Sequence, residues 1–257
     1  MTETVCKEQD GGVLRLTLNR PDKLNAIDLP TLEGLIAALT EAEHSTDVRA
    51  IVLGGNGRSF CAGADIGQMV ERTAEDWRRI VDRYLDPIRL ISRMGKPVIA
   101  RCHGDVFGGG LGLAIACDFR IAADSARFCA PFIKLALAGC DMAAGYFLPR
   151  LIGLGPASDL MMTGRVIDAE EAMGIGLLSR VAPEQDLDSA VDEFAVRLAS
   201  SAPRAMAFTK SAIRKSIDRD MEAEFEYEIF AQVQCLQSAE HREGVAAFRE
   251  HRKPVFQ

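Results

Sequence analysis

The chain lacks an excess of positive charge. Its 257 residues hold 30 lysines and arginines against 37 aspartates and glutamates, a formal net charge of −7. No basic field is available to attract nucleic acid or an anionic membrane, so we expect neither as a partner. No apolar run reaches the length of a membrane span, and the N-terminus has no basic region followed by an apolar one. We therefore expect neither export nor membrane insertion.

Cysteine and histidine are present but form no motif. The seven cysteines are scattered singly without CxxC spacing, and the four histidines show no metal-ligand spacing. Neither GxSxG nor a complete GxGxxG occurs, which argues against a serine hydrolase and a dinucleotide-binding protein. These absences favour a globular protein of a reducing cytoplasm, with no metal and no permanently bound cofactor.

Short apolar runs alternate with helical patterns over much of the chain. Residues 13–18 alternate in hydropathy as a half-exposed strand does, and Asp28 can cap the helix that follows. Further strands are predicted over residues 50–53, 97–102 and 119–122, and helices over residues 74–94 and 111–116. Pro87 is expected to kink the longer helix. The alternation predicts an α/β fold with a mostly parallel sheet.

From about Asp188 onward the pattern is nearly all helical. These late helices carry more apolar side chains than a short tail can bury against itself. They are Phe194, Leu198, Met206, Phe208, Ile213, Phe225, Ile229 and Phe230. We expect them to pack on the core or on other copies of the chain. The predicted division is a core over residues 1–190 and a helical C-terminal region over residues 191–257.

Three passages resemble the crotonase (enoyl-CoA hydratase/isomerase) superfamily. They are NRPDKLNA at residues 19–26, FCAGADI at residues 60–66, and KPVIA at residues 96–100 followed by the triple glycine of residues 108–110. The motifs stand in the family's order, and the similarity covers nearly the whole chain. The resemblance implies a crotonase-like spiral core of ββα units with a helical C-terminal oligomerisation region. It also implies a homo-oligomer, either a trimer or a dimer of trimers.

The resemblance implies an enzyme that acts on an acyl-CoA thioester, with coenzyme A entering as part of the substrate. Loss of a proton beside the thioester carbonyl creates an oxyanion, which needs preorganised N–H donors. In the family these are backbone amides at positions matching Ala64 and Gly109, and glycine lets the thioester approach the backbone closely. The further residues implied at the CoA ester are Lys23, Leu24, Ala26, Ala62, Asp65, Ile66, Gly110 and Phe132. Asp65 equally suits a loop-capping role.

The sequence departs from the family's hydratases at the acid/base positions. The resemblance implies two glutamates that activate water and protonate carbon, but this chain has Gly112 and Phe132 at those positions. One candidate acid remains. Asp141 matches a position where several isomerases of the superfamily carry an aspartate or glutamate that moves a proton. Asp141 equally suits N-capping of the helix that follows.

The leading hypothesis is therefore a double-bond isomerase. Asp141 would remove an α- or γ-proton, the Ala64 and Gly109 amides would hold the enolate, and Asp141 would return the proton elsewhere. Gly112 and Phe132 would form an apolar wall that keeps the intermediate dry. Two alternatives stay open. One is a hydratase of atypical design, in which Asp141 alone positions the water, and the other is a catalytically silent acyl-CoA binding protein.

Overall fold

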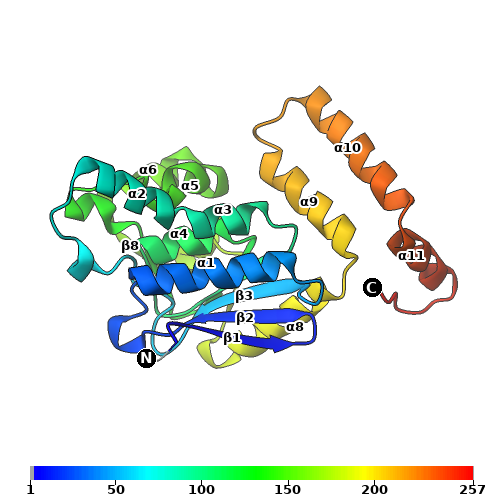
Figure 1. Ribbon diagram of the computed structural model, residues 1–257, viewed down its shortest axis with the longest axis horizontal. Helices are drawn as coiled ribbons and strands as arrows, with labels where there is room; N and C mark the ends of the chain where they lie inside the picture. The colour runs from blue at the N-terminus through cyan, green and yellow to red at the C-terminus, as the bar shows by residue number, and fades with distance from the viewer. Residues whose placement is uncertain (1–2, 257) are drawn as a thin grey trace.

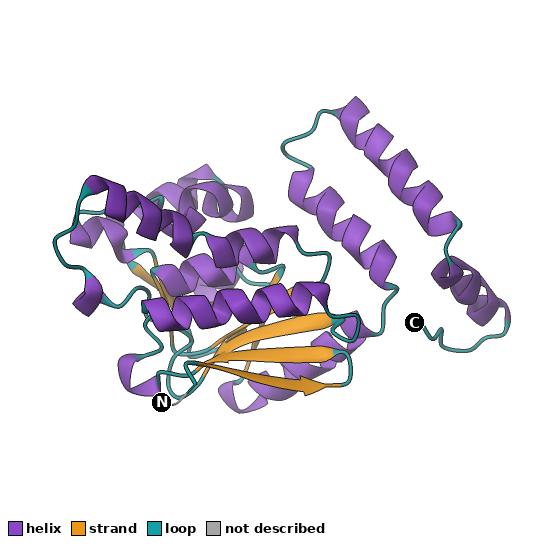
Figure 2. Ribbon diagram, viewed as in Figure 1, coloured by secondary structure: helices purple, strands orange, loops and turns teal. Residues whose placement is uncertain are grey.

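The computed structural model describes residues 3–256, and its main element is a six-stranded sheet of order β1-β2-β3-β4-β6-β9. The strands are β1 (Val5–Asp10), β2 (Val13–Leu18), β3 (Ala50–Gly55), β4 (Val98–Cys102), β6 (Phe119–Ala123) and β9 (Arg180–Ala182). β1 and β2 form an antiparallel hairpin, and every other neighbouring pair is parallel (Figure 2). The predicted, mostly parallel sheet is confirmed, whereas β1 and β9 were not predicted.

A second, smaller sheet includes the strand that ends just before the triple glycine. It consists of β5 (Asp105–Phe107), β7 (Arg127–Cys129) and β8 (Val166–Asp168), with β5 parallel to β7 and β7 antiparallel to β8. An isolated parallel bridge between Cys61 and Val106 connects the loop that carries Ala64 to β5, and a second one, between Ile27 and Ala64, connects that loop to the residues before α1. Strands of three residues are too short to show a periodicity, so the sequence did not predict this sheet.

Helices cover both faces of the large sheet. The helices of the body of the protein are α1 (Leu29–His44), α2 (Ala74–Tyr84), α3 (Asp86–Arg93), α4 (Gly109–Ala116), α5 (Ala144–Ile152), α6 (Leu154–Thr163), α7 (Ala169–Gly174) and α8 (Leu187–Ala199). The main core joins Leu14, Leu16 and Leu18 of β2 to α1, α3 and α4, whereas Val13 packs with α8 on the other face (Figure 1). The alternation predicted for residues 13–18 is therefore confirmed.

The predicted kinked helix over residues 74–94 is two helices. α2 ends at Tyr84 and α3 begins at Asp86, with Pro87 in the first turn of α3. Proline is tolerated there because the first amides of a helix have no intrahelical acceptor. α2 contains no buried residue. Its apolar side chains are therefore free to line a cavity.

Three C-terminal helices, α9 (Pro203–Lys215), α10 (Met221–Leu236) and α11 (Ala239–Arg249), extend from the body (Figure 1). The division expected at residue 190 falls within α8, whose Phe194 packs on the sheet. Lys210 attaches α9 to the body, because its ammonium donates to the Lys96 carbonyl and pairs with Asp118 at 2.7 Å. Between residues 3 and 256, no helix is both long and apolar enough to cross a membrane.

Candidate active site

A cavity opens between α2 and the N-terminal end of α4. It encloses about 960 Å³, open solvent at its mouth included. Its walls are mostly apolar and come from six parts of the chain: residue 29, residues 62–69, residue 72 with α2, residues 108–109, residues 131–137 and residues 141–142. The predicted site residues that line the cavity are Ala62, Ala64, Asp65, Ile66, Gly109, Phe132 and Asp141. The structure therefore brings both predicted amides and the predicted acid to one cavity.

The two predicted amides lie beside each other. A methyl group built on Gly109 would lie 3.6 Å from the Ala64 nitrogen, and one built on Gly63 would lie 3.2 Å from the Gly109 nitrogen. In the Ile27 to Ala64 bridge, the Ile27 amide donates to the Gly63 carbonyl and the Asp65 amide donates to the Ile27 carbonyl. Within the described part of the chain, neither the Ala64 nor the Gly109 amide donates to a protein acceptor. Both remain available to a ligand oxygen.

Glycine is required beside both amides. Gly63 has φ +107° and Gly108 has φ +52°, in the left-handed half of conformational space that other residues rarely adopt. Gly109 is the first residue of α4, so its N–H is one of the donors that an α-helix leaves unpaired at its N-terminus. The partial positive charge of that helix end adds to the attraction for an oxyanion.

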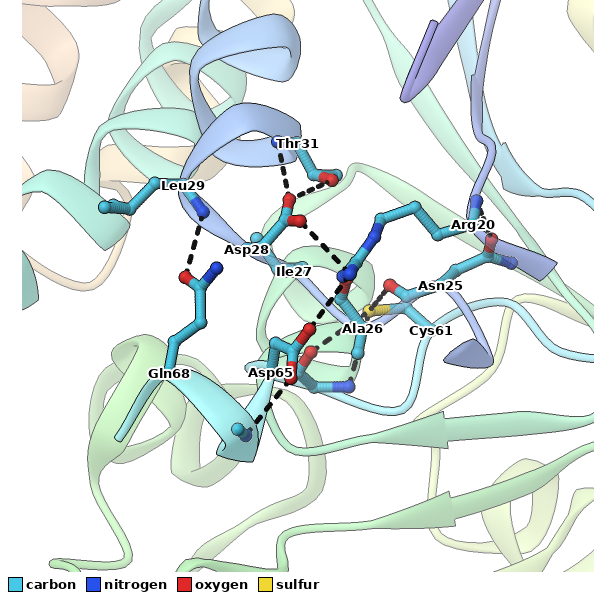
Figure 3. A network of polar contacts seen from close by, with 12 residues as sticks. Arg20, Asn25, Ala26, Ile27, Asp28, Leu29, Thr31, Cys61, Asp65 and Gln68 are labelled. Atoms are coloured by element: carbon cyan, nitrogen blue, oxygen red, sulfur yellow. Dashed lines mark hydrogen bonds and ion pairs between the residues drawn. The ribbon is translucent and has the colours of Figure 1, made fainter. Parts of the chain in front are cut away.

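Arg20 was not predicted as a site residue. It holds together the amide wall, the part of the cavity lining that carries the Ala64 and Gly109 amides. Its guanidinium lies 3.1 Å from a carboxylate oxygen of Asp28 and 3.0 Å from one of Asp65, and it also donates to the Ala26 carbonyl (Figure 3). Asp28 also caps α1 through the Thr31 amide, as predicted. The network therefore fixes the loop over residues 20–28 against the loop that carries Ala64.

Asp65 combines two structural roles with its place in the cavity wall. One carboxylate oxygen pairs with Arg20, and the other accepts from the Gly67 amide at 3.1 Å, which caps a short 3₁₀ helix. The predicted capping role is confirmed. Because both oxygens have protein partners, the Asp65 carboxylate is poorly placed to act as a base.

Cys61 lies under the same loop and is fully buried. Its thiol donates to the Asn25 carbonyl, and burial raises its pKa to about 12. The thiol therefore stays protonated at neutral pH, which excludes it as a nucleophile in this conformation.

Asp141 lines the cavity from the short turn that packs against α4. Its Oδ1 accepts from the Met142 amide at 2.8 Å, whereas Oδ2 has no partner between residues 3 and 256. The N-cap of α5 is Ala143, and no side chain caps that helix. Asp141 therefore does not N-cap α5, which was the structural alternative to a catalytic role. Its side chain instead lines the cavity.

The two positions without the hydratase glutamates differ in their exposure to the cavity. Phe132 lines it, and its ring would lie 3.8 Å from a methyl group built on Gly108. Gly112, in the second turn of α4, is buried and does not line it. Only Phe132 therefore forms the expected apolar wall, and Met142 stands in for Gly112.

Four predicted CoA-ester residues lie outside the cavity lining. A side chain on Gly110 would meet the Cys61 carbonyl at 2.2 Å, so this glycine permits close packing of α4. Lys23, Leu24 and Ala26 form an adjoining turn, in which the Leu24 carbonyl accepts from the Ala62 amide at 2.9 Å. Lys23 is exposed on this turn.

The wall formed by α2 was not predicted from the sequence. Trp77, Ile80, Val81 and Tyr84 line the cavity, and the Tyr84 hydroxyl donates to the Ile27 carbonyl at 2.9 Å. Burial is the main cause that raises the pKa of Tyr84, so the phenol stays protonated. The i, i+3, i+4, i+7 spacing of these residues was the signal that could have identified the wall. Across residues 3–256, no cluster of three or more histidine, cysteine, aspartate or glutamate side chains is placed to hold a metal ion.

Comparison with known proteins shows the family of the chain. The family model described as enoyl-CoA hydratase/isomerase matches residues 8–257. The chain is 34% identical to the short-chain-enoyl-CoA hydratase of Clostridium acetobutylicum over 97% of this chain and 95% of that protein. It is 35% identical to the crotonyl-CoA hydratase of Syntrophomonas wolfei over 99% of this chain and 98% of that protein.

Solved structures show the same relationship. The enoyl-CoA hydratase of Bacillus anthracis superposes with a TM-score of 0.94 at 34% identity, covering 98% of each chain. The enoyl-CoA hydratase of Mycobacterium smegmatis gives a TM-score of 0.93 at 31% identity, again covering 98% of each chain. This chain therefore belongs to the enoyl-CoA hydratase/isomerase family and has its crotonase-like α/β fold.

Proposed function

We propose that this protein is an acyl-CoA enzyme that moves a carbon–carbon double bond, converting a 3-enoyl-CoA into a 2-enoyl-CoA. The supporting observation is that a single available carboxylate, that of Asp141, lines the same cavity as two unpaired backbone amides. The other carboxylate in the lining, Asp65, is engaged by Arg20 and Gly67. One base that takes and returns one proton suits an isomerisation, because no water has to be consumed.

In the proposed reaction the thioester oxygen sits between the Ala64 and Gly109 amides. Asp141 removes a proton from C2, and the electron pair of that bond moves into a dienolate whose negative charge rests on the thioester oxygen. The dienolate then collapses, C4 takes the proton from Asp141, and the double bond ends between C2 and C3. Loss of one amide donor of this kind typically raises a barrier by about 3 kcal/mol.

For the coenzyme A part of the substrate, we propose the loops beside the amide wall. Ala62, Asp65 and Ile66 lie at the cavity lining and would contact it mainly through backbone groups. Lys23 is exposed on the adjoining turn and would meet the negative phosphates. Leu24 and Ala26 would shape this turn, Phe132 would face the thioester, and Gly110 would act through packing.

The decisive assay uses purified protein with a 3-enoyl-CoA and a 2-enoyl-CoA. Formation of the conjugated 2-enoyl thioester, abolished in Asp141→Asn and unchanged in the exposed surface control Asp47→Asn, is the expected result. A second candidate, a hydratase of atypical design, is favoured by the names of the relatives. It predicts instead that oxygen from labelled water appears in a 3-hydroxyacyl product. Tight binding of CoA esters without any turnover would identify a silent binding protein.

We further propose that the chain assembles with copies of itself through its C-terminal helices. Large apolar side chains of these helices and their connections are exposed: Ile213, Ile217, Met221, Phe225, Ile229, Phe230, Val233, Leu236 and Phe248. Isolated chains rarely expose so continuous an apolar surface. Sedimentation should show a trimer or a dimer of trimers, weakened by Ile229→Asp and unaffected by Val196→Asp on α8. A monomeric wild type would contradict this.

A further inference from the structure

Gly112 has no room for a side chain. A Cβ atom built on it would lie 2.4 Å from the Met142 Cβ and 2.7 Å from the Met142 carbonyl oxygen. Both are closer than non-bonded atoms approach in a packed interior. These atoms belong to the backbone and the base of the side chain, so a rotamer change at Met142 cannot relieve the contact.

Met142 separates α4 from the cavity. Met142 lines the cavity and is 4% exposed, whereas Gly112 behind it does not line the cavity. The backbone at Met142 has φ +51° and ψ +38°, and Ala143 follows with φ +60°. Two successive residues other than glycine in the left-handed region are strained, and such strain persists only where the surrounding structure enforces it. Here the turn places Asp141 and Met142 in the cavity wall together.

Between Gly112 and Met142, water has neither space nor a polar side chain as a partner. A buried water needs two to four polar groups and room for its own volume. Gly112 supplies no side chain, and the Met142 thioether is a weak acceptor. Shortening Met142 to alanine removes three heavy atoms from the residue whose backbone N–H donates to the Asp141 carboxylate. We expect the space so created to lie near this acceptor and to suit an ordered water.

We propose that Met142 is a specificity-determining residue that excludes water from the side of Asp141 facing α4. We also propose that residue 112 is a glycine because any side chain there would displace Met142. This inference rests on the proposed isomerisation. It explains how one carboxylate can carry a proton between two carbons without losing it to solvent. The methionine thereby favours internal proton transfer over addition of water.

The test measures how much deuterium is transferred from C2 to C4 of the substrate. A 3-enoyl-CoA with two deuterons at C2 is converted in ordinary water, and deuterium at C4 of the 2-enoyl product is measured by mass spectrometry and NMR. The C2–D bond breaks as the deuteron passes to Asp141, and the C4–D bond forms as Asp141 gives it up. We expect the wild type and the bulk-conserving Met142→Leu to retain most of the transferred deuterium, and Met142→Ala to lose it at least fivefold more often. Equal retention in all three proteins would overturn the inference.

A second measurement does not depend on turnover. Crystal structures of the wild type and Met142→Ala should show an ordered water hydrogen-bonded to the Asp141 carboxylate only in the variant. A dry space in the variant, or the same water in the wild type, contradicts the role of Met142. If the wild type does not convert 3-enoyl-CoA, the proposed function fails, and this structural comparison still decides whether Met142 excludes water.

Discussion

The two walls of the cavity are held in different ways. The amide wall is fixed by two sheet bridges, by glycines with positive φ, and by the Arg20 network, which joins Asp28 to Asp65. The acid wall is a short turn at Asp141–Ala143, with two strained residues and one hydrogen bond from its own backbone to the carboxylate. The two amides that would stabilise the oxyanion are therefore held by long-range contacts of the fold. The carboxylate that would transfer the proton is held by a local turn.

The largest expected effect is on the acid wall and concerns activity alone. Asp141→Asn should lower kcat for isomerisation by about 10³-fold, since positioned acid/base groups contribute 10² to 10⁴. Thermal unfolding should hardly change, because the asparagine carbonyl can still accept from the Met142 amide. Steady-state kinetics and calorimetry on the same preparations check both statements. Retained activity would remove Asp141 from the mechanism.

On the amide wall, substitution of Arg20 should lower the stability of the protein, which Asp141→Asn should hardly change. Arg20→Met leaves Asp28 and Asp65 without their shared cation, and we expect the free energy of unfolding to fall by about 3 kcal/mol. Urea denaturation measures this loss. The red shift of a bound chromophoric CoA thioester, which reports polarisation of its carbonyl, should also shrink, and Arg20→Lys should restore part of both. An unchanged red shift in a folded Arg20→Met variant would show that Arg20 does not position the two amides.

Restoring one hydratase glutamate should not restore hydration. Gly112→Glu must displace Met142, so we expect a loss of about 2 kcal/mol in stability from overpacking, together with slower isomerisation. Hydration of 2-enoyl-CoA should stay at the wild-type level. The measurement is 3-hydroxyacyl-CoA formation alongside denaturant unfolding. A gain of hydratase activity in the single variant would show that the turn carrying Met142 moves more readily than its packing suggests.

The smallest effect is expected at Lys23. An exposed cation near a phosphate contributes roughly 0.5 kcal/mol, so Lys23→Ala should weaken acyl-CoA binding two- to threefold with little change in kcat. Trp77, the chain's only tryptophan, lines the cavity, so its fluorescence can follow the titration. The difference between variant and wild type should disappear at high salt. A difference that persists at high salt would indicate a contact other than a surface ion pair.

Much of the fold was predictable because its signals are local. The alternation of residues 13–18 and the capping side chain of Asp28 agree with β2 and α1 as observed. The strands of the small sheet, by contrast, span three residues each, and pairing between distant segments defines them. The exposure of α10 likewise depends on where the three C-terminal helices lie relative to the body, which hydropathy alone does not determine.

The site was predictable to the extent that single residues carry it. Ala64, Gly109 and Asp141 were identified from motifs and line one cavity. Arg20 was missed because its role is to bridge two loops, and Met142 because its role depends on a backbone conformation and on packing against Gly112. Contacts of this kind join segments far apart in the sequence, so only the folded chain reveals them.

A crystal structure of Asp141→Asn with a bound 3-enoyl-CoA tests most directly whether the two amides bind the thioester oxygen and residue 141 reaches the reacting carbons. We expect the thioester oxygen to lie about 2.7–3.1 Å from both the Ala64 and the Gly109 nitrogens. We also expect the side chain of residue 141 to lie between C2 and C4 of the acyl chain. A thioester oxygen bound away from these two amides, or an acyl chain whose C2 lies out of reach of residue 141, would contradict this proposal.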